Sequence, residues 1–178
     1  MNTATDQAAH SADEAWYIHS SGAYREPRQT SVTEVLRLLG ADMDAESRRW
    51  ANSIELPLWR IPAGTTFLRA DDLADAIHVV RFGYFKIIKI AEDGYQQVRG
   101  LAGPGDVLGF EGAALGRHPL EVAALDDCSV IAVPLSELRT LRHQSQPFDN
   151  ALMRALGEQL AHAGDTASLM APVAAEAR

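Results

Sequence analysis

The sequence predicts a mostly β protein with flanking helices (α+β): a double-stranded β-helix, or jelly-roll-like β-roll, followed by a long helix. Three apolar runs of strand length follow one another closely, at residues 77–82, 84–91 and 95–101. The Asp93-Gly94 pair between the last two runs is a strong hairpin signal, because glycine adopts a positive φ without steric cost. A sharp corner follows at 103–106 (GPGD), where proline fixes φ and the glycines allow left-handed backbone. This order of strands and turns is typical of a small roll around a pocket.

The segment ahead of the strands divides into a tail and two short helices. Residues 1–30 are rich in Ala, Ser, Thr, Asp and Gln, so they are expected to form a flexible tail. Ser31 and Glu34 have the spacing of a capping box, in which each side chain accepts a hydrogen bond from a free backbone N–H. Gly40 is placed to end that helix. A second helix is expected to begin at Asp44.

Two further helices close the domain. Strands are expected from about Leu56 to Val133, then a short helix from Leu135 and a long helix from about Pro147, because proline suits the first turn. Apolar residues recur along the long segment at intervals of three and four, and Pro172 is placed to end it. The expected organisation is a tail (1–30), a β-roll with its leading helices (31–145), a long helix (146–171) and a closing segment (172–178).

Composition limits the classes of function. The chain has 178 residues, of which 47% are hydrophobic and 22% charged, and this suits one globular domain with appendages. Its formal net charge of −8 has the wrong sign for a chain that binds nucleic acid by itself. The sequence has no apolar run of membrane-spanning length and no secretory leader pattern, so a cytoplasmic protein without membrane contact is expected. The single cysteine, Cys128, fits a reducing compartment.

An ordered series of motifs over residues 56–170 resembles one known family. Residues 61–67 (IPAGTTF) are similar to its first strand pair, and residues 80–86 (VRFGYFK) resemble its RSG-x-x-K strand and turn. Residues 105–109 (GDVLG) match its GD-x-x-G motif, and residues 134–138 (PLSEL) resemble its short proline-led helix. The chain therefore resembles the sensory half of the Crp/Fnr superfamily of bacterial transcription regulators, and within it the fumarate and nitrate reduction regulator branch.

The resemblance gives the long helix a role. In the family this helix pairs with the same helix of a second subunit, which implies a homodimer. The residues expected to meet across that pairing lie on one stripe: Leu152, Leu156, Leu160, Ala163 and Ala167. From periodicity alone, the same stripe is also typical of a helix that packs against its own domain. Gly157 and Gly164 lower the helix propensity by about 1 kcal/mol each relative to alanine, so we expect a weak dimer.

The resemblance also places a candidate effector pocket at the corner after the GD-x-x-G motif. Its expected residues are Gly109, Phe110, Glu111, Gly112, Arg117 and His118. In the family's cyclic AMP-binding branch, a glutamate directly after the motif holds the ribose, and a later Arg-Ser pair holds the phosphate. This chain has Phe110 at the first place and residues 117–120 (RHPL) near the second, so cyclic AMP is not the expected effector. An anion needs a fixed cation, and Arg117 is the candidate, although an exposed loop arginine is the commoner case.

No cofactor or catalytic centre is predicted. A four-iron cluster needs about four cysteine thiolates, and Cys128 stands alone beside Asp126 and Asp127, whose charges raise a thiol pKa. No histidine pair has metal-ligand spacing, so no metal site is expected, and His118 is the residue that we would test as a haem ligand. The sequence also lacks the His-x-His of cupin-type metal enzymes and a Gly-x-Ser-x-Gly elbow. Catalysis is therefore not expected.

The expected function follows from the resemblance. The chain should be the effector-sensing and dimerising part of a transcription regulator, in which a winged helix-turn-helix domain after the long helix contacts DNA. Residues 172–178 resemble the hinge that leads into that domain, so DNA binding is expected only through a C-terminal domain that this sequence lacks. The alternative is a stand-alone ligand-binding or interaction module of the same fold with no DNA role. The effector itself stays open.

Overall fold

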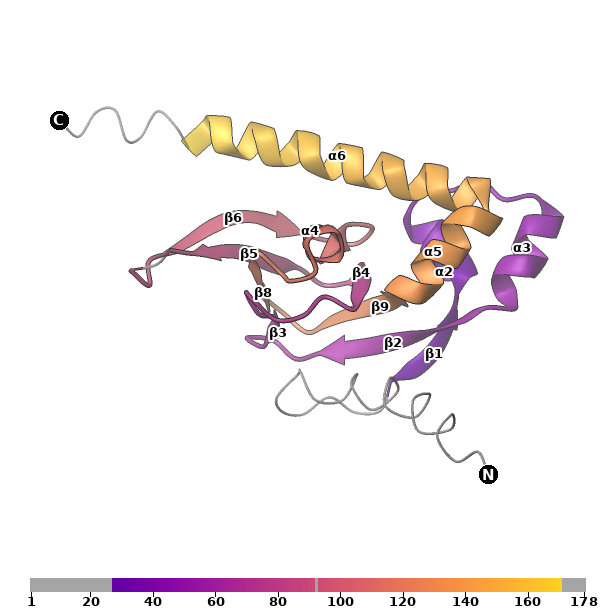
Figure 1. Cartoon of the computed structure of the whole chain (residues 1–178), viewed down its shortest axis with the longest axis horizontal. Helices are drawn as coiled ribbons and strands as arrows, with labels where there is room; N and C mark the ends of the chain where they lie inside the picture. The colour runs from indigo at the N-terminus through magenta and orange to yellow at the C-terminus, as the bar shows by residue number, and fades with distance from the viewer. Residues whose placement is uncertain (1–26, 92, 171–178) are drawn as a thin grey trace, which may run out of the picture.

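The computed structural model describes residues 27–91 and 93–170, and Figure 1 shows two antiparallel sheets with a long helix running over them. One sheet has the strand order β1 (Arg28–Ser31), β2 (Glu55–Ile61), β9 (Cys128–Pro134), β4 (Ala76–Phe82) and β7 (Val107–Leu108). The other has the order β3 (Thr66–Leu68), β8 (Glu121–Ala124), β5 (Phe85–Ile90) and β6 (Gln96–Ala102). The predicted jelly-roll-like β-roll with flanking helices is therefore confirmed.

The helices of the described part are α2 (Val32–Leu38), α3 (Ala45–Asn52), α4 (Phe110–Leu115), α5 (Leu135–Gln144) and α6 (Gln146–Met170). The second helix begins as predicted, because Asp44 Oδ1 accepts a hydrogen bond from the Ser47 N–H at 2.7 Å. The long helix begins one residue before Pro147, where the Ser145 hydroxyl accepts from a backbone N–H. The tail up to residue 26, Pro172 and the hinge-like segment lie outside the described residues. Every helix within residues 27–91 and 93–170 is too short or too polar to span a lipid bilayer.

The predicted start of the domain is wrong in two respects. Residues 28–30, assigned to the flexible tail, form strand β1 and pair with β2. The capping box does not form, because the Ser31 side chain caps no backbone N–H. Glu34 instead accepts hydrogen bonds from the Thr30 hydroxyl and from Arg81 Nε, the latter at 2.6 Å. A guanidinium is a stronger partner for a carboxylate than a backbone amide, so Glu34 ties α2 to β4.

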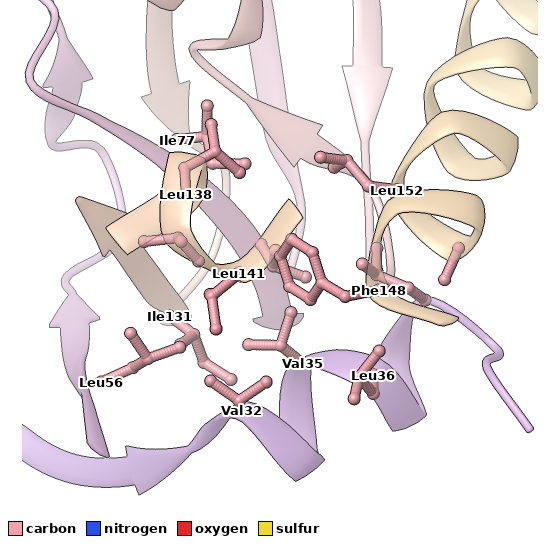
Figure 2. Packing of buried hydrophobic residues seen from close by; sticks show 14 of the residues in the cluster. Val32, Val35, Leu36, Leu56, Ile77, Ile131, Leu138, Leu141, Phe148 and Leu152 are labelled. Carbon is pink, nitrogen blue, oxygen red and sulfur yellow. The ribbon is translucent and has the colours of Figure 1, made fainter. Parts of the chain in front are cut away.

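Two apolar cores share the central strands β4 and β9. The first core lies between the two sheets and includes Val80. The second lies under the helices and includes Val79. In this core Phe148 of α6 lies among side chains of α2 and α5 (Figure 2). Because successive residues of β4 enter different cores, its first five residues are all buried. This is why residues 76–80 (AIHVV) read as a continuous run instead of an alternating one.

The predicted hairpin and corner are confirmed. Gly94 has a φ of +83° between β5 and β6, in the region that favours glycine. At the corner, Asp106 Oδ2 accepts a hydrogen bond from the Gly103 N–H at 2.7 Å. The corner leads into β7, which lies at the edge of the first sheet and pairs with β4.

The first part of α6 is anchored to the domain. Phe148 and Leu152 are fully buried in the second core. Arg154 Nη2 donates hydrogen bonds to the carbonyls of Leu39 at 2.8 Å and Gly40 at 2.6 Å. These carbonyls lie at the C-terminal end of α2, where a cation is favourable. Beyond this anchor, α6 continues over β6 and β7 (Figure 1).

Candidate functional site

A small pocket lies between the two sheets, beneath α6. Its walls come from β3, β5, β7, β8, the start of α4 and the loop after it, and α6 adds one side chain. The apolar wall includes Leu68, Leu108 and Val122, and the polar groups are those of Glu111, His118 and Gln159. The cavity volume is about 20 Å³, which holds roughly one water molecule. In this conformation the pocket is therefore too small for a ligand much larger than a water molecule.

The glycine-led turn into α4 decides which predicted residues reach the pocket. Gly109, Glu111 and His118 line it, and their role in binding an effector stays a prediction. Gly109 is the N-cap of α4 with a φ of +78°, a backbone conformation that favours glycine. Phe110, the next residue, packs instead against the second core. Its assignment to the pocket is wrong, because successive side chains of a helix point in different directions. Glu111 therefore faces the pocket and Phe110 does not.

Arg117 and Gly112 also lie outside the pocket lining, so their assignment is corrected too. The Arg117 guanidinium donates a hydrogen bond to the backbone carbonyl of Asp71. Gly112 lies behind the His118 ring, and a Cβ at this position would be 2.5 Å from His118 Nδ1. Gly112 therefore leaves the space that the buried imidazole occupies. Arg117 holds a loop, and it provides no charge inside the pocket.

Two buried histidines lie close together inside the roll. His78 on β4 is 7% exposed, its ring meets Phe67 edge-on at 4.8 Å between centroids, and its Nδ1 has no hydrogen-bond partner. Burial, and then the nearby His118, lowers the pKa of His78 to about 3. Burial also lowers the pKa of His118, although three nearby carboxylates act in the opposite direction. Both imidazoles are therefore neutral at neutral pH, so neither supplies a cation for an anionic ligand.

Gln159 on α6 is the site residue that the sequence analysis missed. Its Oε1 accepts a hydrogen bond from the Val107 N–H at 3.1 Å, and its Nε2 donates to the Val107 C=O at 3.0 Å. β7 is the end strand of its sheet, so the carboxamide satisfies two backbone groups that face away from the neighbouring strand. No local signal marks this role, because the two residues are 52 positions apart.

The comparisons with known proteins agree with this geometry. Residues 58–145 match the family model described as a cyclic nucleotide-binding domain. Over 118 residues the chain is 28% identical to the fumarate nitrate reduction regulatory protein of Klebsiella oxytoca, and the match covers 66% of this chain and 47% of that protein. The chain therefore resembles the Crp/Fnr family over its cyclic nucleotide-binding domain. It spans about half the length of the curated relatives that it matches.

Solved structures share this fold. The c-di-GMP responsive global regulator CLP of Xanthomonas campestris superposes with a TM-score of 0.63 at 22% identity, covering 69% of this chain and 61% of that one. The catabolite activator protein of Thermus thermophilus superposes with a TM-score of 0.55 at 20% identity, covering 65% and 55%. The roll and its C-terminal helix are therefore the architecture of this group.

Cys128 is a buried free cysteine, and it is expected to react poorly. Its Sγ lies 3.3 Å from the Tyr84 carbonyl and from Asp126 Oδ1. Burial raises the pKa of the thiol to about 11, and the hydrogen bond and charge of Asp126 add to this effect. The predicted influence of Asp126 is thus confirmed. Within residues 27–91 and 93–170, no group of three or more His, Cys, Asp or Glu side chains is arranged to hold a metal ion.

The residues of the predicted dimer stripe on α6 lie in different environments. Leu152 is fully buried in its own domain, so it has no exposed surface that a second subunit could cover. Its assignment to the dimer interface is therefore wrong. Leu156 is partly buried against the second core. Leu160 is 76% exposed. The side chains of Ala163 and Ala167 lie outside the described part.

Proposed function

We propose that this chain is the cytoplasmic effector-sensing and dimerising part of a Crp/Fnr-type transcription regulator, which acts on DNA through an attached DNA-binding domain. The observation that carries the proposal lies on one turn of α6. Gln159 lines the pocket, and Leu160, the next residue, is 76% exposed. A helix that contacts the pocket with one side chain and offers an apolar side chain to solvent can transmit a change in the pocket to a second subunit.

The proposed mechanism is a population shift between two positions of α6. A ligand shifts such an equilibrium only by its difference in affinity for the two positions. With α6 in the described position, the cavity of about 20 Å³ has room for only about one water molecule. A ligand larger than one water molecule would favour a position in which Gln159 has moved away from Val107.

Leu160→Glu is the test of the dimerising role. We expect the dissociation constant of a homodimer to rise at least about tenfold, because the charge would meet its own copy across a two-fold axis. Sedimentation equilibrium measures this constant. Leu115→Glu is the matched control, since Leu115 on α4 is a leucine of similar exposure, 70%, and this change should leave the mass unchanged. A parent protein that is monomeric at every concentration would refute the proposal, as would a Leu160→Glu variant that stays dimeric.

Cyclic AMP is not the effector that we propose. The Arg117 guanidinium is bonded to the Asp71 carbonyl, and the carboxylate of Glu111 lines the pocket. Polar atoms of a bound nucleotide would therefore stay unmatched, at a cost of about 1–3 kcal/mol each. We expect calorimetry to show no heat of binding at micromolar cyclic AMP. Saturable binding that is lost in Glu111→Ala would contradict this prediction.

We also propose that the chain is no enzyme and holds no resident metal, iron–sulfur cluster or haem. The sequence has one cysteine, and its thiol has a raised pKa. His118, the candidate haem ligand, lies against Gly109 and Gly112 so closely that a Cβ at either position would be within 3.1 Å of its ring. A porphyrin at this imidazole would need the corner to be rebuilt. The relatives named above are regulatory proteins, which supports the same view.

A further inference from the structure

The edge of β7 is covered by a side chain. Val107 pairs with Val79 of β4 on one side, and on the other side its N–H and C=O are bonded to the Gln159 carboxamide. The free edge of a sheet normally binds water or another strand. Here one primary amide presents the acceptor and the donor that the C=O and N–H of one residue in an antiparallel neighbouring strand would present.

The covered edge opens directly into the pocket. Val107 and Gln159 both belong to the pocket lining, together with an apolar wall that includes Leu68 and Leu108. The carboxamide thus forms part of the wall of a cavity of about 20 Å³. If Gln159 moved away, the cavity would grow by the volume of the carboxamide, and it would contain one unmatched donor and one unmatched acceptor.

The charge of the pocket selects against an anion. Glu111 contributes a carboxylate, and the pKa of His118 is lowered by burial, so its imidazole is neutral at neutral pH. Arg117 is bonded outside the pocket lining. A neutral ligand avoids the cost of placing a negative charge in a buried site without a cation.

On these grounds we infer that the effector is a small, neutral, mainly apolar molecule with a cis-amide edge, such as a lactam or an imide. It binds Val107 in place of the Gln159 carboxamide, and its apolar part fills the enlarged cavity. This inference rests on the proposed function and adds the chemistry of the ligand. Competition between the ligand and Gln159 is then the step that releases α6 from β7.

The test is a chemical rescue of Gln159→Ala. We expect this change to lower the melting temperature by about 2–6 °C, because the buried N–H and C=O of Val107 lose their partners. Millimolar δ-valerolactam, whose ring N–H and C=O share one edge, should restore most of this loss in a saturable way. Cyclohexanone has the same ring but no N–H, so it should restore less than half as much. A lactam effect no larger than the ketone effect would overturn the inference.

Two further measurements keep the test decisive. In Gln159→Leu the leucine side chain fills the space left by the carboxamide, so the lactam should not change the melting temperature. A rise in melting temperature equal to that of the alanine variant would argue against the site. If Gln159→Ala does not fold, NMR of the parent protein replaces it. The lactam should then shift the Val107 amide and the Gln159 side-chain amide together, and unchanged signals would contradict the inference. These readouts need no dimer, so their failure is distinct from the failure of the Leu160→Glu test.

Discussion

Replacing Phe148 with alanine is expected to lower the free energy of unfolding by about 3–5 kcal/mol. Phe148 is fully buried at the start of α6, and its ring lies among Leu141, Val35 and Leu36 (Figure 2). These neighbours come from α5 and α2, so the cavity left by the ring cannot close without moving a helix. Urea unfolding followed by circular dichroism measures the loss.

Met153→Ala is the matched control for this prediction. Met153 lies on the same helix but is 53% exposed, so its truncation should change the free energy of unfolding by only about 0.5 kcal/mol. A Phe148→Ala loss as small as that of the control would mean that α6 is not anchored in the second core.

His78→Leu is expected to remove much of the acid sensitivity of the domain. The unfolded chain binds a proton on this histidine below about pH 6.5, whereas the buried imidazole has a pKa of about 3. Above pH 6.5 the imidazole is neutral in both states, so its burial adds no pH-dependent cost. As the pH falls from 6.5 toward 3, only the unfolded chain binds the proton, so the folded state loses stability. The loss is about 1.4 kcal/mol for each pH unit, or about 2 kcal/mol at pH 5.

Urea unfolding at a series of pH values tests this prediction. The difference in stability between His78→Leu and the parent should grow steadily below pH 6.5. Phe67→Leu is the control, because it removes the ring that contacts His78 but leaves the titrating imidazole in place. Its curve should run parallel to that of the parent. Parallel curves for His78→Leu as well would show that this imidazole is not held neutral by the fold.

The elements that the sequence predicted are those with local signals. The hairpin at Gly94 and the corner at Gly103 depend on turn residues whose conformational preferences act without the rest of the chain. Strand β1 was missed because residues 28–31 (RQTS) have no apolar pattern and form a strand only by pairing with β2. The capping box failed for a similar reason, since Arg81 competes for Glu34 from another strand.

The candidate site was only partly predictable. Glu111 and His118 were found through the motif that positions them, but Phe110 was misplaced because one helical residue changes the direction of a side chain by about 100°. Gln159 was missed because its partner is distant in the sequence. The burial of His78 could not be predicted either. A histidine in an apolar strand is expected on an exposed face, and only the structure shows that this part of β4 is buried on both faces.

The anchor at Arg154 makes α6 a lever. Arg154 and the buried Phe148 fix the beginning of the helix, so the helix would pivot there. A ligand in the pocket would act on the helix at Gln159, which lies over the pocket. From Arg154 to the last described residue, Met170, the helix extends roughly 24 Å, so a tilt of about 10° would displace its far end by roughly 4 Å. Movement of one carboxamide at β7 would thus reach the end of the helix as a displacement larger than a hydrogen-bond length.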